Sequence, residues 1–320
     1  MKSHSHAEIK AQIKDSKGLI VEDMVQEDSV NILVGDSGIG KTPLLMQLGL
    51  CVSAGLPFLG LATRPGPVLY VDHENAKSDL SDILDNLLIH VGLDIAPETL
   101  RFLHFPGSLA EMEQEIAAMK PLFVIVDSVR GMDPQMEKDN TSAGSRIAYL
   151  YRLAEKYHCA FLLLHHIRKV DPKEPPPKIA AATNVMDWLQ QSSGARALIN
   201  QTEARFGIEE YTVGTASLAI RGHFKLRGEV GPWMLERVFN EYDDALGYSR
   251  ISGLQLLSQI ERDRFNKLPA TFRWKEAQQI IAPGIKGGKA ISQLLRRAQA
   301  AGLLLRTGRK PDLAYQKVSK

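Results

Sequence analysis

Eight consecutive residues have the spacing of a phosphate-binding loop. They are Gly35, Asp36, Ser37, Gly38, Ile39, Gly40, Lys41 and Thr42, and they match the pattern G-x-x-x-x-G-K-[ST]. Glycines allow backbone N–H groups to surround phosphate oxygens without a clash from a Cβ atom, and the lysine adds a positive charge. The hydroxyl of Thr42 is a suitable Mg²⁺ ligand. The pattern therefore predicts a site for ATP and Mg²⁺ at residues 35–43, with Lys41 as a catalytic residue.

The flanking sequence provides the context that such a loop needs. Asn31-Ile32-Leu33-Val34 predicts a strand before it, and Leu44 to Ala54 predicts a helix after it. Pro43 belongs to the first helical turn, where its missing N–H is not needed. The N-terminus of a helix favours an anion, because its free N–H groups and its dipole both carry positive charge. A glycine-rich structural turn is the alternative interpretation.

A second apolar run ends in a carboxylate. Leu122 to Val126 is continuous and apolar, and Asp127 follows it. A carboxylate in this place predicts a ligand of the Mg²⁺ hydration shell, opposite Thr42. An aspartate at the end of a strand is also a common turn former. The catalytic and metal-binding assignment of Asp127 therefore depends on its pairing with the phosphate-binding loop.

Hydrolysis of a triphosphate also needs a group that orients and deprotonates water. The apolar run Val68 to Val71 is followed by Asp72-His73-Glu74-Asn75. At the carboxyl end of a strand near the loop, Glu74 is the candidate base. Asp72 is the competing candidate, and capping of the following helix is the alternative role for Glu74.

Two adjacent histidines follow a further apolar run, Phe161 to Leu164. Because neighbouring residues of a strand point to opposite faces, only one of His165 and His166 can face the nucleotide. The alternative is a pair of structural histidines with satisfied hydrogen bonds. We find no further His or Cys residues in the spacing of a transition-metal site.

The apolar runs alternate with segments of helical periodicity. This alternation predicts an α/β fold with a mainly parallel sheet flanked by helices. After residue 210 the pattern becomes rich in hairpins, which would extend or close the sheet. The expected strands lie at residues 30–34, 68–71, 101–104, 122–127 and 160–165, and the helices at residues 44–54, 79–91 and 145–157.

The chain is expected to contain two domains, because 320 residues exceed the usual size of a single core. We assign residues 1–28 to an N-terminal arm, 29–240 to the α/β domain, 241–250 to a polar linker and 251–320 to a small C-terminal domain. The small domain is expected to be a winged helix. Its expected helices are Ile251–Phe265, Arg273–Ile281 and Lys289–Ala301, and its expected hairpin joins Leu303–Arg306 to Leu313–Val318.

Charge is distributed unevenly between the two parts of the chain. Residues 250–320 carry 15 Lys and Arg against 4 Asp and Glu, whereas the rest of the chain is acidic. A basic appendage suggests a polyanionic partner, and a solvated face without a partner is the alternative. In a winged helix we expect DNA contacts from five residues, with a protein partner as the alternative. These residues are Lys289, Arg296, Arg297, Arg309 and Lys310.

Composition and the lack of a recognisable targeting signal predict a cytoplasmic protein. The chain contains 44% hydrophobic residues, which is ordinary for a globular protein. Its two cysteines, Cys51 and Cys159, lie in apolar runs and do not form a disulfide framework. Neither an apolar signal segment nor a run long enough to span a membrane is evident, so we expect no membrane partner.

These motifs together resemble the RecA-like superfamily, and within it the RepA-type hexameric replicative helicases of plasmids. The matching segments are NILVGDSGIGKT, PGPVLYVDHEN, LFVIVDSVRGM, FLLLHHIRK and SSGARALINQTEARF, across about residues 18–210. The resemblance implies a homo-oligomeric ring, a hexamer, with ATP at each interface. It implies that Glu74 is the catalytic glutamate, Asp127 the Walker B acid and His166 the γ-phosphate sensor. It also implies that Lys169 and the loop at residues 170–193 face a channel for single-stranded DNA.

One position departs from the pattern of these relatives. Glu203 occupies the place of their arginine finger, the cation that completes a neighbour's active site. Arg205 lies two residues later and points the same way in an extended strand, so it is the expected finger, with Arg196 as the alternative.

Two hypotheses for the function remain open from the sequence. The first is a DNA-dependent ATPase that acts as a helicase or translocase on single-stranded or forked DNA. The second is an ATP-gated DNA-binding or adaptor protein that assembles on nucleotide without unwinding, and a small-molecule kinase is a weaker third.

Overall fold

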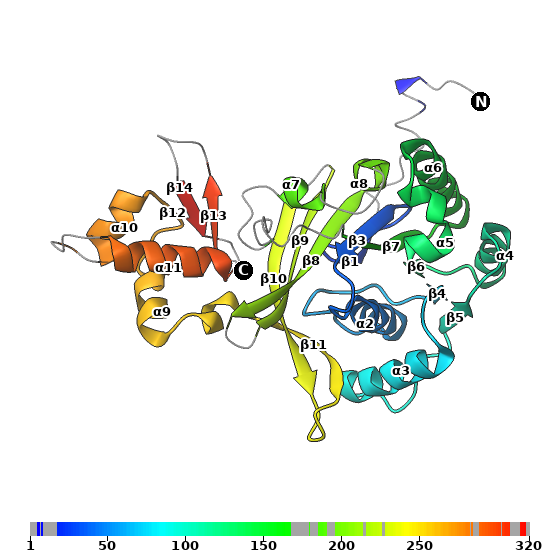
Figure 1. Cartoon of the computed structure of the whole chain (residues 1–320), viewed down its shortest axis with the longest axis horizontal. Coiled ribbons are helices and arrows are strands. Elements are labelled where there is room, and N and C mark those ends of the chain that lie inside the picture. The colour runs from blue at the N-terminus through cyan, green and yellow to red at the C-terminus, as the bar shows by residue number, and fades with distance from the viewer. Residues whose placement is uncertain are drawn as a thin grey trace.

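The computed structural model describes residues 18–167, 185–190, 196–213, 216–225, 228–281, 288–301, 303–307 and 314–317, together with residues 5, 6, 8, 179 and 283. Two layers of helices enclose a central sheet of nine strands in these residues (Figure 1). The strands are β3 Val30–Gly35, β4 Val68–Asp72, β5 Leu100–His104, β6 Phe123–Asp127, β7 Ala160–His166, β8 Ala204–Val213, β9 Ala216–Phe224, β10 Gly228–Phe239 and β11 Ala245–Ile251.

The order of the strands is β11-β10-β9-β8-β3-β7-β6-β4-β5. Strands β8, β3, β7, β6, β4 and β5 are parallel to one another. Strands β9, β10 and β11 continue the sheet in antiparallel order. The prediction of a RecA-like, mainly parallel α/β sheet is therefore confirmed, and the hairpin-rich segment after residue 210 extends the sheet.

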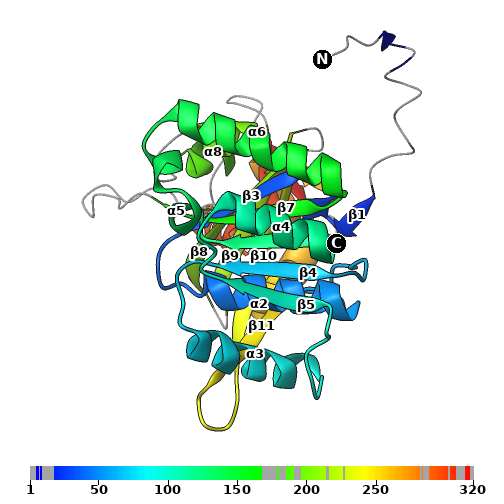
Figure 2. The same ribbon diagram turned by 90° about the vertical axis from the view of Figure 1, so that its right-hand side faces the viewer.

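Helices cover both faces of the sheet. Figure 2 shows α2 and α3 on one side of the strands and α6 and α8 on the other. The helices of this part of the chain are α2 Lys41–Ala54, α3 Lys77–Val91, α4 Leu109–Met119, α5 Val129–Met132, the 3₁₀ helix η1 Pro134–Glu137, α6 Asn140–Tyr157, α7 Val185–Leu189 and α8 Arg196–Gln201.

Alternate residues of the central strands pack into two separate cores. In β4, Val68 and Tyr70 contact the core beneath α2 and α3, whereas Leu69 and Val71 contact the core beneath α4, α6 and α8. Both sides of the strand are apolar because both faces of a parallel sheet are buried. This burial explains the continuous apolar runs of the sequence.

The N-terminal arm is shorter than predicted. Residues 18–28, assigned to the arm, form a small hairpin of β1 Leu19–Val21 and β2 Val25–Gln26. Ile20, Val21 and Val25 are fully buried in the core beneath α2. The assignment was wrong for this segment because two very short strands carry too few residues to show a period.

The predicted linker at residues 241–250 is also wrong. Its first half is the turn of a hairpin, in which the side-chain oxygen of Asn240 accepts hydrogen bonds from the N–H groups of Tyr242 and Asp244, both at 2.9 Å. Its second half belongs to β11, which pairs with β10. The polar sequence reflects an exposed turn, whereas Tyr248 is only 2% exposed.

The described residues between 252 and 317 form a smaller part with its own core, which we call the C-terminal unit. It lies beside the antiparallel end of the large sheet (Figure 1). Its small sheet has the strand order β12-β14-β13. Its elements are the 3₁₀ helix η3 Gly253–Leu256, α9 Gln259–Asn266, β12 Thr271–Phe272, α10 Trp274–Ile281, α11 Lys289–Ala300, β13 Leu304–Thr307 and β14 Ala314–Lys317.

The first helix of the C-terminal unit differs from the prediction of one helix at 251–265. Ile251 still belongs to β11, η3 follows, and α9 begins only after Ser258. Ser258 and Glu261 form a capping box, which starts a new helix at that point. The separation of the C-terminal unit as a domain of its own stays a prediction. No helix of the described residues is both long and apolar enough to cross a membrane.

Candidate nucleotide-binding and active site

The functional residues meet at one edge of the sheet. Gly35, His166, Asp127 and Asp72 end the four adjacent strands β3, β7, β6 and β4. Since parallel strands have their carboxyl ends at the same edge, residues separated by more than 100 positions become neighbours there. Ligands of open α/β sheets bind at such an edge.

The phosphate-binding loop joins β3 to α2. Gly38 and Gly40 have φ values of +77° and +92°, a region that favours glycine. Gly40 precedes the first residue of α2, and no side chain caps that helix end. The free N–H groups of the first turn therefore remain available for an anion.

Lys41 is held inside the loop. Its side chain is 5% exposed, and Nζ donates a hydrogen bond of 2.5 Å to the carbonyl oxygen of Asp36. Burial lowers the pKa of Lys41, and the charges of Asp127, Asp36 and Glu74 oppose that effect. The ammonium is thus oriented by the loop itself before any phosphate binds.

Asp127 faces the phosphate-binding loop, and its two carboxylate oxygens differ in their hydrogen bonds. The hydroxyls of Thr42 and Tyr70 both donate to Oδ2, at 2.7 and 2.8 Å. The buried Oδ1 has no hydrogen-bond partner among the described residues. Burial raises the pKa of Asp127, and the two hydroxyls lower it. An unpaired buried carboxylate oxygen beside a threonine hydroxyl fits the oxygen ligands that Mg²⁺ prefers.

Glu74 is a partly exposed carboxylate at this edge. Its side chain is 37% exposed, Oε1 lies 3.7 Å from His166 Nε2, and the Ser128 hydroxyl donates to the same oxygen. These contacts, first of all that with His166, lower the pKa of Glu74 to about 2 against the opposing effect of burial. Glu74 is therefore ionised at neutral pH.

Asp72, the competing candidate base, accepts hydrogen bonds from the turn that follows β4. It is fully buried, and its oxygens accept from Asn75 N at 3.0 Å and Asn75 Nδ2 at 2.5 Å. The geometry therefore favours Glu74 as the group that can reach water.

The two histidines lie on opposite faces, as the strand period predicts. His166 Nδ1 lies 3.3 Å from Ser37 Oγ and 3.5 Å from Lys41 Nζ, inside the site. His165 is fully buried, and its Nδ1 lies 3.5 Å from Glu137 Oε1 on the other face. The structure therefore brings His166 together with Lys41 and Glu74.

The structure does not support Arg205 as an arginine finger. Arg205 is 6% exposed, pairs with Ile32 in the interior of the sheet, and donates from Nε and Nη2 to the carbonyl oxygen of Thr202 at 3.2 and 2.9 Å. It therefore satisfies carbonyl groups at the end of α8 within its own chain. Arg196, the alternative, is exposed at the first residue of α8.

The expected DNA-binding residues are only partly described. Lys289 and Arg296 are exposed on α11. Arg297 is also exposed, but its Nη1 lies 2.7 Å from Glu261 Oε1. Lys169, Arg309 and Lys310 lie outside the described residues.

Four residues near the loop were not predicted from the sequence. Tyr70 and Ser128 lie within the quoted motifs, but nothing marks them as partners of Asp127 and Glu74. Arg237 and Tyr248 contact the loop from about 200 positions further along the chain. Neither spacing nor composition signals a contact at that separation.

A glycine-rich loop between a parallel strand and a helix, with a buried aspartate facing its threonine, is the nucleotide site of a P-loop ATPase, and here it lies on a RecA-like sheet. Comparison with known families agrees with this class. The family model described as "AAA domain" matches residues 2–172, more than half of the chain, and the chain belongs to that family.

Further similarities include one curated protein and one solved structure. The chain is 23% identical over 199 residues to the DNA repair protein RadA of Synechocystis sp. (strain ATCC 27184 / PCC 6803 / Kazusa), a match that covers 55% of this chain and 36% of RadA. The chain thus spans about a third of that relative's length. A KaiC-like protein from Pyrococcus horikoshii OT3 is 12% identical, with a TM-score of 0.45 over 72% of this chain and 93% of the archaeal chain.

Proposed function

We propose that this protein is a Mg-ATP-hydrolysing, DNA-dependent ATPase that acts as a ring-shaped helicase or translocase of the RepA type. The observation that carries this proposal is the group of side chains at the carboxyl edge of the sheet. It combines a buried lysine, a paired threonine and aspartate, and an ionised glutamate beside a histidine. These are the parts that phosphoryl transfer to water requires.

Each residue of the group has a distinct task in this proposal. Lys41 and the loop N–H groups bind the β- and γ-phosphates, and Thr42 with Asp127 holds Mg²⁺. The metal, when bound, neutralises charge on the phosphates. Glu74 orients and deprotonates the attacking water, and His166, between Glu74 and Lys41, senses the γ-phosphate.

A neighbouring copy of the chain is expected to complete this site. Among the described residues, the group of side chains contains one lysine, Lys41, beside His166. The Arg205 side chain instead donates hydrogen bonds to a carbonyl oxygen of its own chain. We propose Arg196 as the cation supplied in trans, in a hexameric ring with ATP at each interface.

We propose that the C-terminal unit is a winged helix that binds DNA. Its three helices and its β13–β14 hairpin follow in the order of that fold, and α11 exposes Lys289 and Arg296. The similarity to a protein named for DNA repair agrees with a DNA substrate. Contacts of this kind release counterions, so binding should weaken steeply with salt.

The test is ATP turnover with Mg²⁺, with and without single-stranded DNA. We expect turnover that DNA stimulates and that Lys41→Ala abolishes. Strand displacement on a forked duplex then separates a helicase from a translocase. ATP turnover that is unaffected by DNA would contradict the motor proposal.

The second candidate is an ATP-gated DNA-binding or adaptor protein. The observation that favours it is the buried position of Arg205, which removes the arginine finger expected from the sequence. This candidate predicts that Mg-ATP changes assembly or DNA affinity while turnover stays very slow and unstimulated.

A further inference from the structure

Two side chains from the antiparallel end of the sheet contact the phosphate-binding loop. The Tyr248 hydroxyl, from β11, donates to the carbonyl oxygen of Gly40 at 3.2 Å. Nη2 of Arg237, from β10, lies 3.3 Å from the carbonyl oxygen of Ile39 and 3.2 Å from the Tyr248 hydroxyl. The guanidinium also lies over the Tyr248 ring, 5.6 Å from its centre.

Both contacts reach carbonyl oxygens of the loop, whereas phosphates are bound by N–H groups. The Tyr248 hydroxyl also occupies the space beside Gly40, where an added Cβ atom would lie only 1.9 Å from it. Tyr248 and Arg237 therefore support the loop from behind and leave its N–H groups free.

The backbone of Tyr248 is fixed to two helices. Gln47 of α2 donates from Nε2 to Tyr248 O at 2.8 Å and accepts from Tyr248 N at 2.9 Å. His90 of α3 lies with Nε2 3.1 Å from the same carbonyl oxygen. A shift of the loop and the start of α2 must therefore be transmitted to β11.

β11 leads directly into the C-terminal unit. It ends at Ile251, Ser252 caps η3, and Gly253 packs so closely that an added Cβ atom would lie 2.0 Å from the carbonyl oxygen of Ala301. Ala301 follows the last residue of α11, the helix that exposes Lys289 and Arg296.

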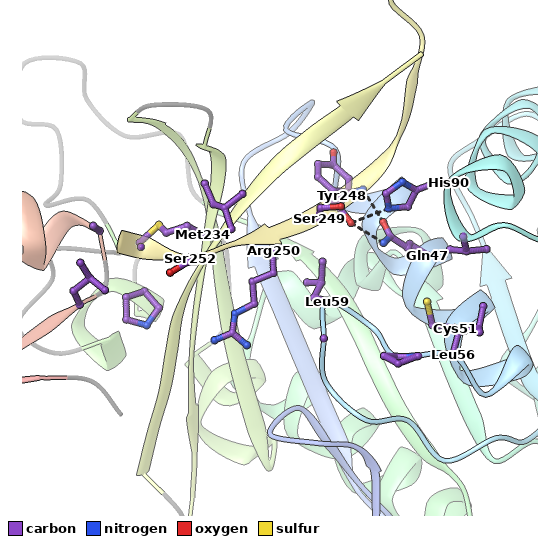
Figure 3. Close-up of a pocket in the computed structure, with 18 residues that line it drawn as sticks. Gln47, Cys51, Leu56, Leu59, His90, Met234, Tyr248, Ser249, Arg250 and Ser252 are labelled. Carbon is purple, nitrogen blue, oxygen red and sulfur yellow. Dashed lines mark hydrogen bonds between the residues drawn. The ribbon is translucent and has the colours of Figure 1, made fainter. Parts of the chain in front are cut away.

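A cavity of about 820 Å³ separates the two parts of the molecule beside this connection (Figure 3). Gln47 and His90 line it on one side, and Ala301 and Leu303 of the C-terminal unit line it on the other. Tyr248, Ser249 and Arg250 of β11 cross it, as Figure 3 shows. The space permits the C-terminal unit to move relative to α2 and α3, with β11 as the packed link.

We infer that Tyr248 and Arg237 are positioning residues for the phosphate-binding loop, and that through β11 they couple nucleotide binding to the placement of the C-terminal unit. The inference rests on the proposed function only in that the loop binds ATP. Coupling between two sites is reciprocal, so a ligand held by α11 must change ATP affinity by the same factor.

The test compares Tyr248→Phe and Arg237→Gln in the full chain with the control Tyr242→Phe. Tyr242 is 78% exposed at the tip of the hairpin formed by β10 and β11. Removal of its hydroxyl should therefore not affect the phosphate-binding loop. We expect Tyr248→Phe and Arg237→Gln each to raise the Kd for ATP roughly three- to tenfold, which is the range for the loss of one hydrogen bond. The change in kcat should be smaller. The control should match the parent.

The second readout is energy transfer between dyes on Ile95→Cys and Ile260→Cys, with and without Mg-ATP. These positions are 79% and 64% exposed, whereas the natural Cys51 and Cys159 are buried, which raises the pKa of each thiol to about 12 and keeps it unreactive. We expect ATP to change the transfer efficiency in the parent and in Tyr242→Phe, and to change it far less in Tyr248→Phe.

The outcomes separate this inference from the proposed function. No ATP binding by the parent would overturn both. ATP binding without a change in energy-transfer efficiency would overturn the coupling alone. So would a Tyr248→Phe variant with the same Kd for ATP and the same energy-transfer response as Tyr242→Phe. A loss of preference for ATP over GTP in Tyr248→Phe, which keeps the ring, would place the hydroxyl against the base and overturn its bracing role.

Discussion

At the scale of single residues, the two carboxylates of the site differ in burial and in pKa. Asp127 is buried, with a raised pKa and one open oxygen, and suits a metal. Glu74 is partly exposed, with its pKa lowered to about 2, and suits contact with water. The two groups of the same chemistry are therefore expected to take different parts in the proposed hydrolysis.

Glu74→Gln is expected to separate binding from hydrolysis. The amide cannot accept a proton from water, so kcat should fall on the order of 100-fold or more. The loop contacts of Lys41 and Thr42 remain, so the Kd for Mg-ATP should change little. Single-turnover kinetics and equilibrium titration measure the two quantities, and an equal loss of both would show that Glu74 instead supports binding.

Glu74 should also contribute to the dependence of stability on pH. Its pKa is about 2 in the folded chain against 4.5 for an unperturbed group, so its ionisation favours the folded state. That stabilisation is fully present above pH 4.5 and is lost as the pH falls toward 2, and solvent at a side chain that is 37% exposed makes it modest.

Urea unfolding at a series of pH values checks this expectation. Glu74→Gln should unfold with a smaller loss of free energy between pH 5 and 3 than the parent. Glu155→Gln, at an exposed position of α6, serves as the control. Identical slopes in parent and Glu74→Gln would refute the contribution of Glu74.

Lys41 was predicted from the G-x-x-x-x-G-K-[ST] pattern. Glu74 and Asp127 were predicted because they follow apolar runs at strand ends, and His166 was chosen from the histidine pair through the resemblance to a family. Arg205 was misassigned because extended geometry fixes the side of a strand but not whether that side is buried against α8. Tyr248 could not be found, since its contact with Gly40 spans 208 positions.

At the scale of elements, the apolar runs predicted the parallel strands, while short and polar elements were missed. β12 has two residues and gains its place only by pairing with β14. The polar turn before β11 looked like a linker because hydrogen bonds of Asn240, rather than apolar packing, order it. Local pattern therefore fails where tertiary pairing supplies the order.

Ser258→Ala is expected to destabilise the start of α9. The Ser258 side chain accepts a hydrogen bond from Glu261 N, and the Glu261 carboxylate accepts one from Ser258 N. The substitution removes the first of these hydrogen bonds and leaves the backbone donor of the second in place. The expected cost is about 1 kcal/mol in the free energy of unfolding. Ser78→Ala, at an exposed position of α3, should change little in the same denaturation experiment.

The exposed arginines of α11 should differ in their effect on DNA binding. Arg296 has no ion pair among the described residues, whereas Arg297 is paired with Glu261 at 2.7 Å. Arg296→Ala should therefore weaken binding more than Arg297→Ala, and should reduce the salt slope by about one unit. Fluorescence anisotropy at several salt concentrations measures both, and equal losses would show that Arg297 exchanges Glu261 for phosphate.

At the scale of the whole molecule, the proposed ring places each active site between two copies. Arg196→Ala should then bind ATP normally and lose turnover on the order of 10³-fold. Lys41→Ala subunits still carry Arg196, and Arg196→Ala subunits still carry an intact loop. A mixture of the two should therefore regain turnover that neither variant has alone.

The control for this mixture uses subunits that carry both substitutions. They should restore no turnover to Arg196→Ala subunits, because they supply neither the loop nor the arginine. If the simple mixture also stays inactive, while mass spectrometry shows mixed assemblies, Arg196 does not act in trans.

The parallel pairing of β3 has a consequence for the synthesis of the chain. β3 needs β7 on one side, with Val30 opposite Phe161, and β8 on the other, with Ile32 opposite Arg205. Contacts between distant segments form slowly, and a chain on the ribosome acquires its C-terminal partners last. The phosphate-binding loop is thus made about 208 residues before Tyr248, and it gains the contact of Tyr248 with Gly40 only when that residue has emerged. A nascent chain should therefore be unable to retain ATP until the whole sheet has been translated.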